Sequence, residues 1–192
     1  MKRVMVVGPS RAGKDTACEY LARVTSLRFA GTTSHYLALY VAARLGVSVR
    51  EAYRSRHANR NLWHRVGNEI RRLDPGLLVR ESLRHAEITG GVRGIEEIQA
   101  CRRERLVDVI VWIDNARVPA SSRITFGPAD CDAVVPNNGT LEEFHDSLVL
   151  WALSAGLPMI CLRGSTQPFR PVCNRCNVRQ SQATREGVCP PK

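Results

Sequence analysis

The fold is decided by residues 4–16, which read VMVVGPSRAGKDT. The apolar run 4–7 predicts a buried strand, and the apolar spacing of residues 14–24 predicts a helix directly after it. Between them lies a glycine-rich loop in which four residues separate Gly8 from Gly13-Lys14. This spacing is typical of a loop that holds nucleotide phosphates with its backbone N–H groups and its lysine.

We therefore expect the loop to bind the phosphates of ATP, with Lys14 at the β- and γ-phosphates. The expected phosphate contacts are Gly8, Ser10, Arg11, Ala12, Gly13, Lys14, Asp15 and Thr16.

Asp15 occupies the position at which such loops usually carry a hydroxyl that binds Mg²⁺. The apolar stretch 88–92, followed by Arg93, has no carboxylate that could support the metal from a strand end. Asp15 is therefore a candidate Mg²⁺ ligand or a base toward an acceptor hydroxyl. The alternative is a structural carboxylate that caps the helix.

The remaining chain alternates apolar strand-like runs with helical periodicity, which predicts an α/β fold with a parallel sheet covered on both faces. A composition change near residue 160 predicts one domain, residues 1–160, followed by a basic, cysteine-containing tail, residues 161–192. The expected strands are 3–7, 27–30, 88–92, 107–113 and 133–136, and the expected helices are 14–24, 35–45, 50–73 (one or two helices), 75–86, 94–105 and 140–154.

The net charge of +10 is concentrated in two segments. Residues 50–84 hold nine Arg against four acidic residues, and residues 157–192 hold five Arg and one Lys against one Glu. Such clustering favours a polyanionic partner such as DNA, although a solvated helix face and a basic tail would give the same count. No apolar run is long enough to span a membrane, and we expect a cytoplasmic protein.

Seven cysteines are present. We expect Cys18, Cys101, Cys131 and Cys161 to be small buried residues. Cys173, Cys176 and Cys189 have the spacing of an incomplete zinc ribbon, with Cys161 as a possible fourth Zn²⁺ ligand. A basic tail with reduced thiols is the alternative.

Several stretches together resemble the phage-type deoxynucleoside monophosphate kinases. Gly13-Lys14-Asp15-Thr16 is similar to their phosphate loop, 62–75 to their Gly-x-Glu-x-x-Arg and Asp-Pro stretch, and 89–97 to a strand end with Asp-Val-Arg. The segment 132–144 resembles one that this family shares with dephospho-coenzyme A kinases. The resemblance implies a phosphate-loop kinase fold over residues 3 to about 155.

By position, the resemblance implies a role for several further residues. Asn137 and Asn138 would lie near the adenine, Arg65, Arg71 and Arg93 would face the acceptor, and Arg117 and Arg123 would act on the transferring phosphoryl group. Two departures concern the acceptor side: residues 29–34 lack the expected Asp and Lys, and Gly90 or Gly91 stands where the family has Asp.

A narrower similarity, from GPSRAGKDT through FAGTTS to the segment 117–143, is to the phage 5-hydroxymethyluracil DNA kinases. These phosphorylate a base hydroxymethyl group within DNA, on the way to hypermodified thymidines, and would work in the host cytoplasm. The similarity implies that Thr32, Thr33 and Ser34 line a base pocket and that Trp63 or Tyr53 stacks, although Trp63 fits a core position equally well.

Three hypotheses therefore stand at this point. The first is a DNA-base kinase, the second a deoxynucleoside monophosphate kinase for free nucleotide, and the third a catalytically inactive DNA-binding module with the same fold. The sequence does not predict an oligomeric state.

Overall fold

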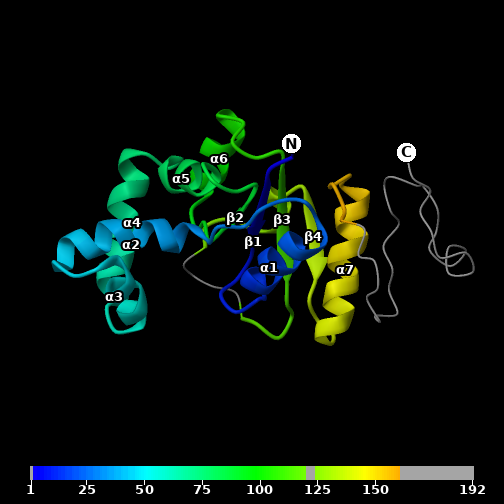
Figure 1. The fold of residues 1–192 in the computed structure, drawn as a ribbon, viewed down its shortest axis with the longest axis horizontal. Helices are drawn as coiled ribbons and strands as arrows, with labels where there is room; N and C mark the ends of the chain where they lie inside the picture. Colours follow the sequence, from blue (N-terminus) through cyan, green and yellow to red (C-terminus); the bar gives the residue numbers. More distant parts are fainter. Residues whose placement is uncertain (1, 120–123, 161–192) are drawn as a thin grey trace, which may run out of the picture.

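The computed structural model describes residues 2–119 and 124–160. Its centre is one four-stranded sheet formed by β1 (Val4–Val7), β2 (Ile88–Gly90), β3 (Val109–Asp114) and β4 (Ala133–Pro136), in the order β2-β1-β3-β4 (Figure 1). All pairings are parallel, and Val7 lies opposite Trp112 in the register. The predicted α/β class with a parallel sheet is confirmed. The carboxyl ends of all four strands therefore share one edge.

The helices cover the sheet, and on one side some of them reach beyond its edge. They are α1 (Lys14–Val24), α2 (Thr33–Leu45), α3 (Val49–Arg54), α4 (Arg60–Leu73), α5 (Leu77–Leu83), α6 (Ile95–Arg103) and α7 (Leu141–Ser154), with short 3₁₀ turns η1 (Ser55–His57) and η2 (Pro128–Asp130). The predicted helix 50–73 is thus divided into α3, η1 and α4.

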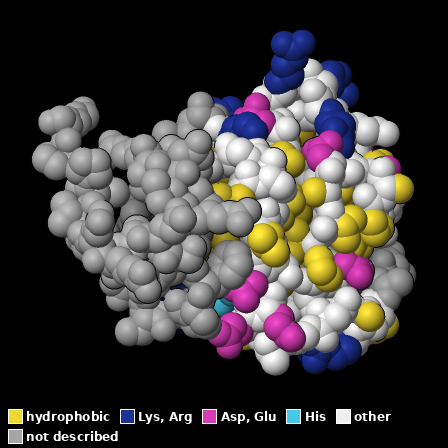
Figure 2. Space-filling view, turned by 90° about the vertical axis from the view of Figure 1, so that its right-hand side faces the viewer, with side chains coloured by type: hydrophobic (Ala, Val, Ile, Leu, Met, Phe, Trp, Pro, Cys, Tyr) yellow, Lys and Arg dark blue, Asp and Glu magenta, His cyan; other side chains and the backbone are white. Residues whose placement is uncertain are grey.

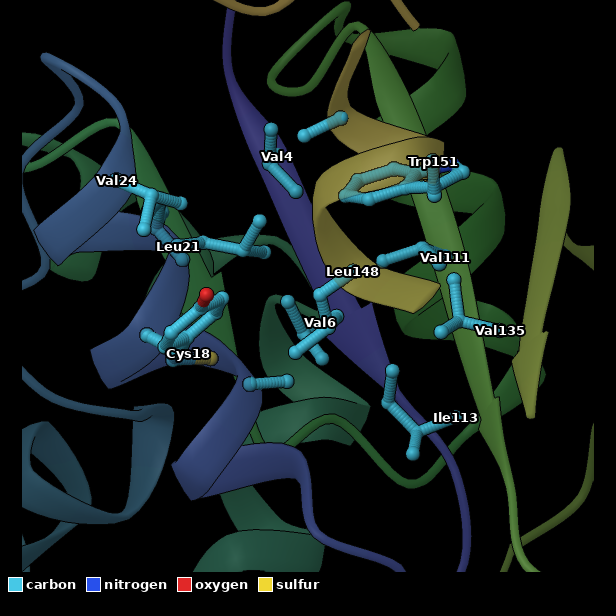
Figure 3. Packing of buried hydrophobic residues seen from close by; sticks show 14 of the residues in the cluster. Val4, Val6, Cys18, Leu21, Val24, Val111, Ile113, Val135, Leu148 and Trp151 are labelled. Carbon is cyan, nitrogen blue, oxygen red and sulfur yellow. The ribbon is translucent and has the colours of Figure 1, made fainter. Parts of the chain in front are cut away.

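Alternate residues of β1 point to opposite faces of the sheet. Val4 and Val6 pack with α1 and α7, where Figure 3 shows Leu21 and Leu148 beside them. Met5 and Val7 belong to a second cluster with α5 and α6. Both faces of the central strand are therefore buried, as a parallel sheet requires.

A third apolar cluster lies among α2, α3, α4 and α5, which we call the helical lobe. Its members are Leu37, Ala38, Val41, Ala42, Ala52, Trp63, Val66, Ile70 and Leu78. In Figure 1, α2, α3 and α4 lie together beyond β2, at the end of the molecule opposite α7. The lobe therefore has a core of its own beside the sheet.

The predicted strand 27–30 is wrong. Phe29 makes only an isolated parallel bridge to Ile88. The carbonyl oxygen of Arg28 accepts hydrogen bonds from the N–H groups of both Glu87 and Ile88, each at 2.9 Å. The chain then turns away at Gly31, so that no ladder continues.

The end of the molecule at α7 has an apolar surface (Figure 2). Hydrophobic side chains gather there with acidic ones nearby. On β4 and α7, Val134, Leu141 and Leu150 are exposed by 50%, 60% and 58%.

None of the helices in the described ranges has the length and apolar character needed to cross a bilayer.

Candidate functional site

The glycine-rich loop lies at the carboxyl edge of the sheet, between β1 and α1. The first hydrogen bond of α1 runs from the N–H of Ala17 to the carbonyl oxygen of Gly13, at 2.9 Å. The N–H groups of Lys14, Asp15 and Thr16 precede that bond, and Gly13 provides no side-chain cap. This arrangement leaves the positive end of the helix available to a phosphate.

Asn137, just after β4, fixes the loop from the other side. Its Nδ2 donates a hydrogen bond to the carbonyl oxygen of Ala12 at 2.8 Å, and its backbone N–H donates to the backbone carbonyl oxygen of Asp114 at 2.6 Å. Gly13 has φ +99°, and a Cβ atom there would lie 2.5 Å from Asn137 Nδ2. Position 13 therefore requires glycine, both for the backbone angle and for the room taken by Asn137.

Lys14 is half-buried at the start of α1, and its ammonium group donates to the carbonyl oxygen of Pro9 in the same loop. Burial lowers the pKa of Lys14, and Arg93 lowers it further, while Asp15 opposes both. An anion bound beside Lys14 would relieve this cost because it favours the charged form of the amine. The loop thus has the donors and the charge that nucleotide phosphates need.

Two adjoining cavities of about 230 Å³ and 240 Å³ open beside the loop. Both are lined by Ser10 and Arg11 of the loop, Ser34 of α2, and Gly91 after β2. The second cavity also contains Gly8, Lys14 and Asp15. The first extends into the helical lobe toward Leu37, Trp63 and Leu78.

Both cavities are strongly basic. Their arginines are Arg11, Arg56, Arg60 and Arg93 in both, with Arg71 in the first. Asp15 is the one acidic residue among the described residues that line them. A ligand of these cavities is therefore expected to be anionic.

Glu97 organises two of these arginines from within the protein. Its side chain is 1% exposed, and its Oε2 accepts hydrogen bonds from the N–H groups of Arg93 at 2.8 Å and Gly94 at 2.9 Å. Arg71 Nη1 lies 3.9 Å from the same oxygen. Burial raises the pKa of Glu97, although Arg71 and the two N–H groups act in the opposite direction.

Gly91 is one of the two glycines, with Gly90, that were expected where the resembling kinases carry Asp. It has φ +93°, and a Cβ atom there would lie 2.8 Å from Thr33 Oγ1. A Cβ atom at Gly90 would lie 2.8 Å from the carbonyl oxygen of Val6. Neither position has room for a carboxylate, so the end of β2 cannot carry a metal-supporting side chain in this arrangement.

The predicted site residues divide into two groups. Those that line both cavities are Ser10, Arg11, Ser34 and Arg93. The second cavity adds Gly8, Lys14, Asp15 and Thr32, and the first adds Thr33 and Arg71. Ala12 is buried within the loop, and Thr16 is exposed beyond it. Arg65 is exposed on α4 and lines neither cavity.

Arg117 and Asn138 belong to the β3–β4 side of the edge. Arg117 Nη2 donates to the carbonyl oxygen of Gly139 at 2.8 Å, and Asn138 Oδ1 accepts from the N–H of Ala116 at 2.7 Å. Neither residue lines the two cavities. Arg123 lies outside the described residues, so its expected contact with the phosphoryl group stays a prediction.

The predicted metal ligands lie in different parts of the chain, and both metal sites stay predictions. Asp15 is exposed, and Asp114, which sequence reasoning did not select, ends β3 at the same edge of the sheet. In residues 2–119 and 124–160, no three His, Cys, Asp or Glu side chains form a cluster that could hold a metal. Cys173, Cys176, Cys189 and Cys161 lie outside the described residues.

The three cysteines within the described residues, Cys18, Cys101 and Cys131, are free thiols that are buried to different extents. Cys18 and Cys101 are buried, as predicted, and burial raises the pKa of the Cys101 thiol to about 12. Cys131 is only half-buried, and burial raises its pKa to about 11.

The main residues that sequence reasoning missed are Arg56, His57 and Arg60, at the junction of α3, η1 and α4. The available signal was the basic segment 50–84, which contains them without distinguishing them from its other arginines. Which arginines reach the cavities depends on the break of the helix at η1.

A comparison with models of known protein families finds no match for this chain, and a comparison with curated proteins finds none either.

Proposed function

We propose that this protein is an ATP-dependent phosphotransferase that phosphorylates the hydroxymethyl group of 5-hydroxymethyluracil in DNA. One observation carries the proposal: a loop suited to nucleotide phosphates opens directly into arginine-lined cavities. Donor and acceptor could therefore meet at Lys14.

In the proposed reaction, the hydroxymethyl oxygen attacks the γ-phosphorus of ATP. A new O–P bond forms, the bond from the γ-phosphorus to the β–γ bridging oxygen breaks, and ADP leaves with that electron pair. Lys14, Arg11 and Arg93 would stabilise the charge on the transferring group. The proton of the hydroxyl would pass to Asp15, if it acts as the base, or to water.

Mg²⁺, when bound with ATP, would neutralise phosphate charge, and Asp15 is the carboxylate on the loop that could ligate it. Asn137 would hold the loop in shape through Ala12. Thr32, Thr33 and Ser34 at the start of α2 would line the base pocket, since all three reach the cavities.

The second candidate is a deoxynucleoside monophosphate kinase. The arginines of the cavities favour it as well, because they suit the phosphate of a free nucleotide. The missing carboxylate at Gly90 and Gly91 and the basic segments 50–84 and 157–192 favour the DNA acceptor.

The test measures transfer of labelled γ-phosphate from ATP to two acceptors in parallel. These are DNA that contains 5-hydroxymethyluracil and the corresponding free monophosphate. Label in DNA alone supports the proposal, and label in the free nucleotide alone supports the monophosphate kinase. Label in neither would refute both and leave the inactive DNA-binding module.

Asp15→Asn separates the possible roles of the carboxylate. We expect loss of transfer with ATP binding largely retained. Turnover at the wild-type rate in this variant would make Asp15 a structural residue.

A further inference from the structure

The junction of α3, η1 and α4 places two arginines, Arg56 and Arg60, at the wall that the two cavities share. Neither arginine was selected by sequence reasoning. Neither forms an ion pair with any acidic residue in the described ranges. By contrast, Arg71 lies near Glu97, and Arg80 is paired with Asp74 and Glu104.

Arg56 is held in place by neighbouring aromatic residues. Its guanidinium carbon lies 4.4 Å from the centre of the Tyr53 ring, and its Nη1 donates to the Tyr53 carbonyl oxygen at 3.2 Å. The Tyr53 ring stacks on His35 of α2, with ring centres 4.3 Å apart. These contacts use one face and one donor of the guanidinium group, and leave further N–H groups for a ligand.

Arg60 adds a second guanidinium group from the first turn of α4. It is exposed, and the same two cavities contact it. Two arginines that line the same cavities and have no ion pair to a carboxylate in the described ranges suit an oxyanion, and phosphate is the group that matches the guanidinium fork.

We infer that Arg56 and Arg60 bind a phosphate group of the acceptor, next to the nucleotide whose hydroxyl reacts. This inference rests on the proposed function, since it assigns the arginines to the acceptor and not to ATP. Both arginines also line the cavity that contains Lys14 and Asp15, so the bound phosphate and the reacting hydroxyl lie in one space.

Two sources could supply this phosphate. One is the phosphodiester that flanks the target base in a DNA strand, and the other is the 5′-phosphate of a free nucleotide. The chemistry of recognition is the same, so the experiment needs an acceptor of each kind.

The experiment measures binding with no ATP present. The probe is a short, fluorescein-labelled, single-stranded oligonucleotide with one 5-hydroxymethyluracil, and its binding to the full chain is followed by anisotropy. Unlabelled 5-hydroxymethyldeoxyuridine 5′-monophosphate and the nucleoside, which has no phosphate, serve as competitors. The variants are Arg56→Gln, Arg60→Gln and the double variant.

Arg54→Gln is the matched control. Like each single variant, it removes one charge from the same segment, but Arg54 is exposed and lines neither cavity. Because every variant keeps the tail 161–192, any affinity that the tail contributes is common to all of them. Arg60→Gln has no described contact to lose, so it remains informative if Arg56→Gln disturbs the packing around Tyr53.

We expect the double variant to bind the oligonucleotide at least about tenfold more weakly than Arg54→Gln, because a charge-assisted phosphate contact at each arginine is lost. Its binding should also depend less steeply on salt, by about one to two in the logarithmic slope. An oligonucleotide that binds far more tightly than the monophosphate identifies the flanking phosphodiester, and similar affinities identify the 5′-phosphate.

Equal binding by Arg60→Gln, the double variant and Arg54→Gln would overturn the inference. So would competition by the nucleoside as strong as that by the monophosphate, or the absence of binding to the wild type. Failure of the proposed function appears separately, as a lack of transfer in the labelled-ATP assay.

Discussion

Replacing Gly13 by Ala tests whether Asn137 and the glycine-rich loop stabilise each other. The new Cβ would lie 2.5 Å from Asn137 Nδ2, at a backbone φ of +99°. The left-handed backbone costs about 1–2 kcal/mol for a residue with a side chain. Asn137 must also move away, so its hydrogen bond to the Ala12 carbonyl oxygen is lost. That loss costs about 1 kcal/mol, or up to about 3 kcal/mol if the carbonyl oxygen finds no other donor.

The free energy of unfolding, measured by urea denaturation, should therefore fall by about 2–5 kcal/mol in Gly13→Ala. Asn137→Ala alone should lose about 1–3 kcal/mol, since it removes the same hydrogen bond. In the double variant that bond is lost only once and the clash is absent. The double variant should thus be more stable than the sum of the single effects predicts, by about 1 kcal/mol or more.

Gly46→Ala is the control for the backbone contribution. Gly46 ends α2 at φ +66°, and a Cβ atom there would meet nothing within 4 Å. Its substitution should cost only the left-handed backbone, about 1–2 kcal/mol. Strict additivity of Gly13→Ala and Asn137→Ala, or equal losses in Gly13→Ala and Gly46→Ala, would refute the reasoning.

Three further predictions concern the site and its support. Lys14→Met should reduce phosphoryl transfer in the labelled-ATP assay roughly a hundredfold or more, because it removes a charge at the phosphates. The control Lys2→Met changes a residue at the opposite edge of the sheet and should transfer labelled phosphate at the wild-type rate. Burial raises the pKa of Glu97 above its unfolded value, so the stability that this group contributes is present at low pH and is lost as the pH rises through its folded pKa. In Glu97→Gln, the amide oxygen can still accept both N–H bonds. The stability of this variant relative to the wild type should therefore increase as the pH rises from about 4 to about 7, as measured by urea denaturation at each pH. A relative stability that decreases over this range would mean that Arg71 controls the pKa of Glu97. Thr140→Ala should lower the free energy of unfolding by about 1 kcal/mol, because the Thr140 hydroxyl caps α7 at the N–H of Glu143 (3.2 Å), and an unchanged urea midpoint would contradict that role.

The sequence was most informative where a local pattern determines the structure. The spacing of Gly8, Gly13 and Lys14 after an apolar run predicted a strand, a loop and a helix, and β1 and α1 have those positions. The predicted helix 140–154 agrees with α7 (Leu141–Ser154) to within one residue. Each of these signals depends on residues that are near one another in the chain.

Features that depend on distant residues could not be predicted in the same way. The run 27–30 looked like a strand, but its pairing is decided by Glu87 and Ile88. Arg65 and Arg60 are near neighbours in one basic segment, yet only Arg60 lines the cavities. Arg65 follows Arg60 by five residues and so lies on another side of α4. The packing of the helical lobe decides which side of α4 faces the cavities, and that packing depends on distant residues.

The separate core of the helical lobe has an evolutionary consequence. The lobe packs around Val41, Val66 and Ile70, whereas the phosphate loop is supported by β1, β3 and Asn137. Mutations at these three lobe positions can accumulate without touching the residues that support the loop, whereas Val79 and Leu83 of α5 pack against Met5 and Val7 of β1 and are not free in this way. Under the proposed function, a lineage with this architecture could exchange one acceptor for another while it inherits the nucleotide-binding half unchanged. Chimaeras that transplant residues 33–73 between relatives, and so leave Val79 and Leu83 in place, would recapitulate such a change in a single step.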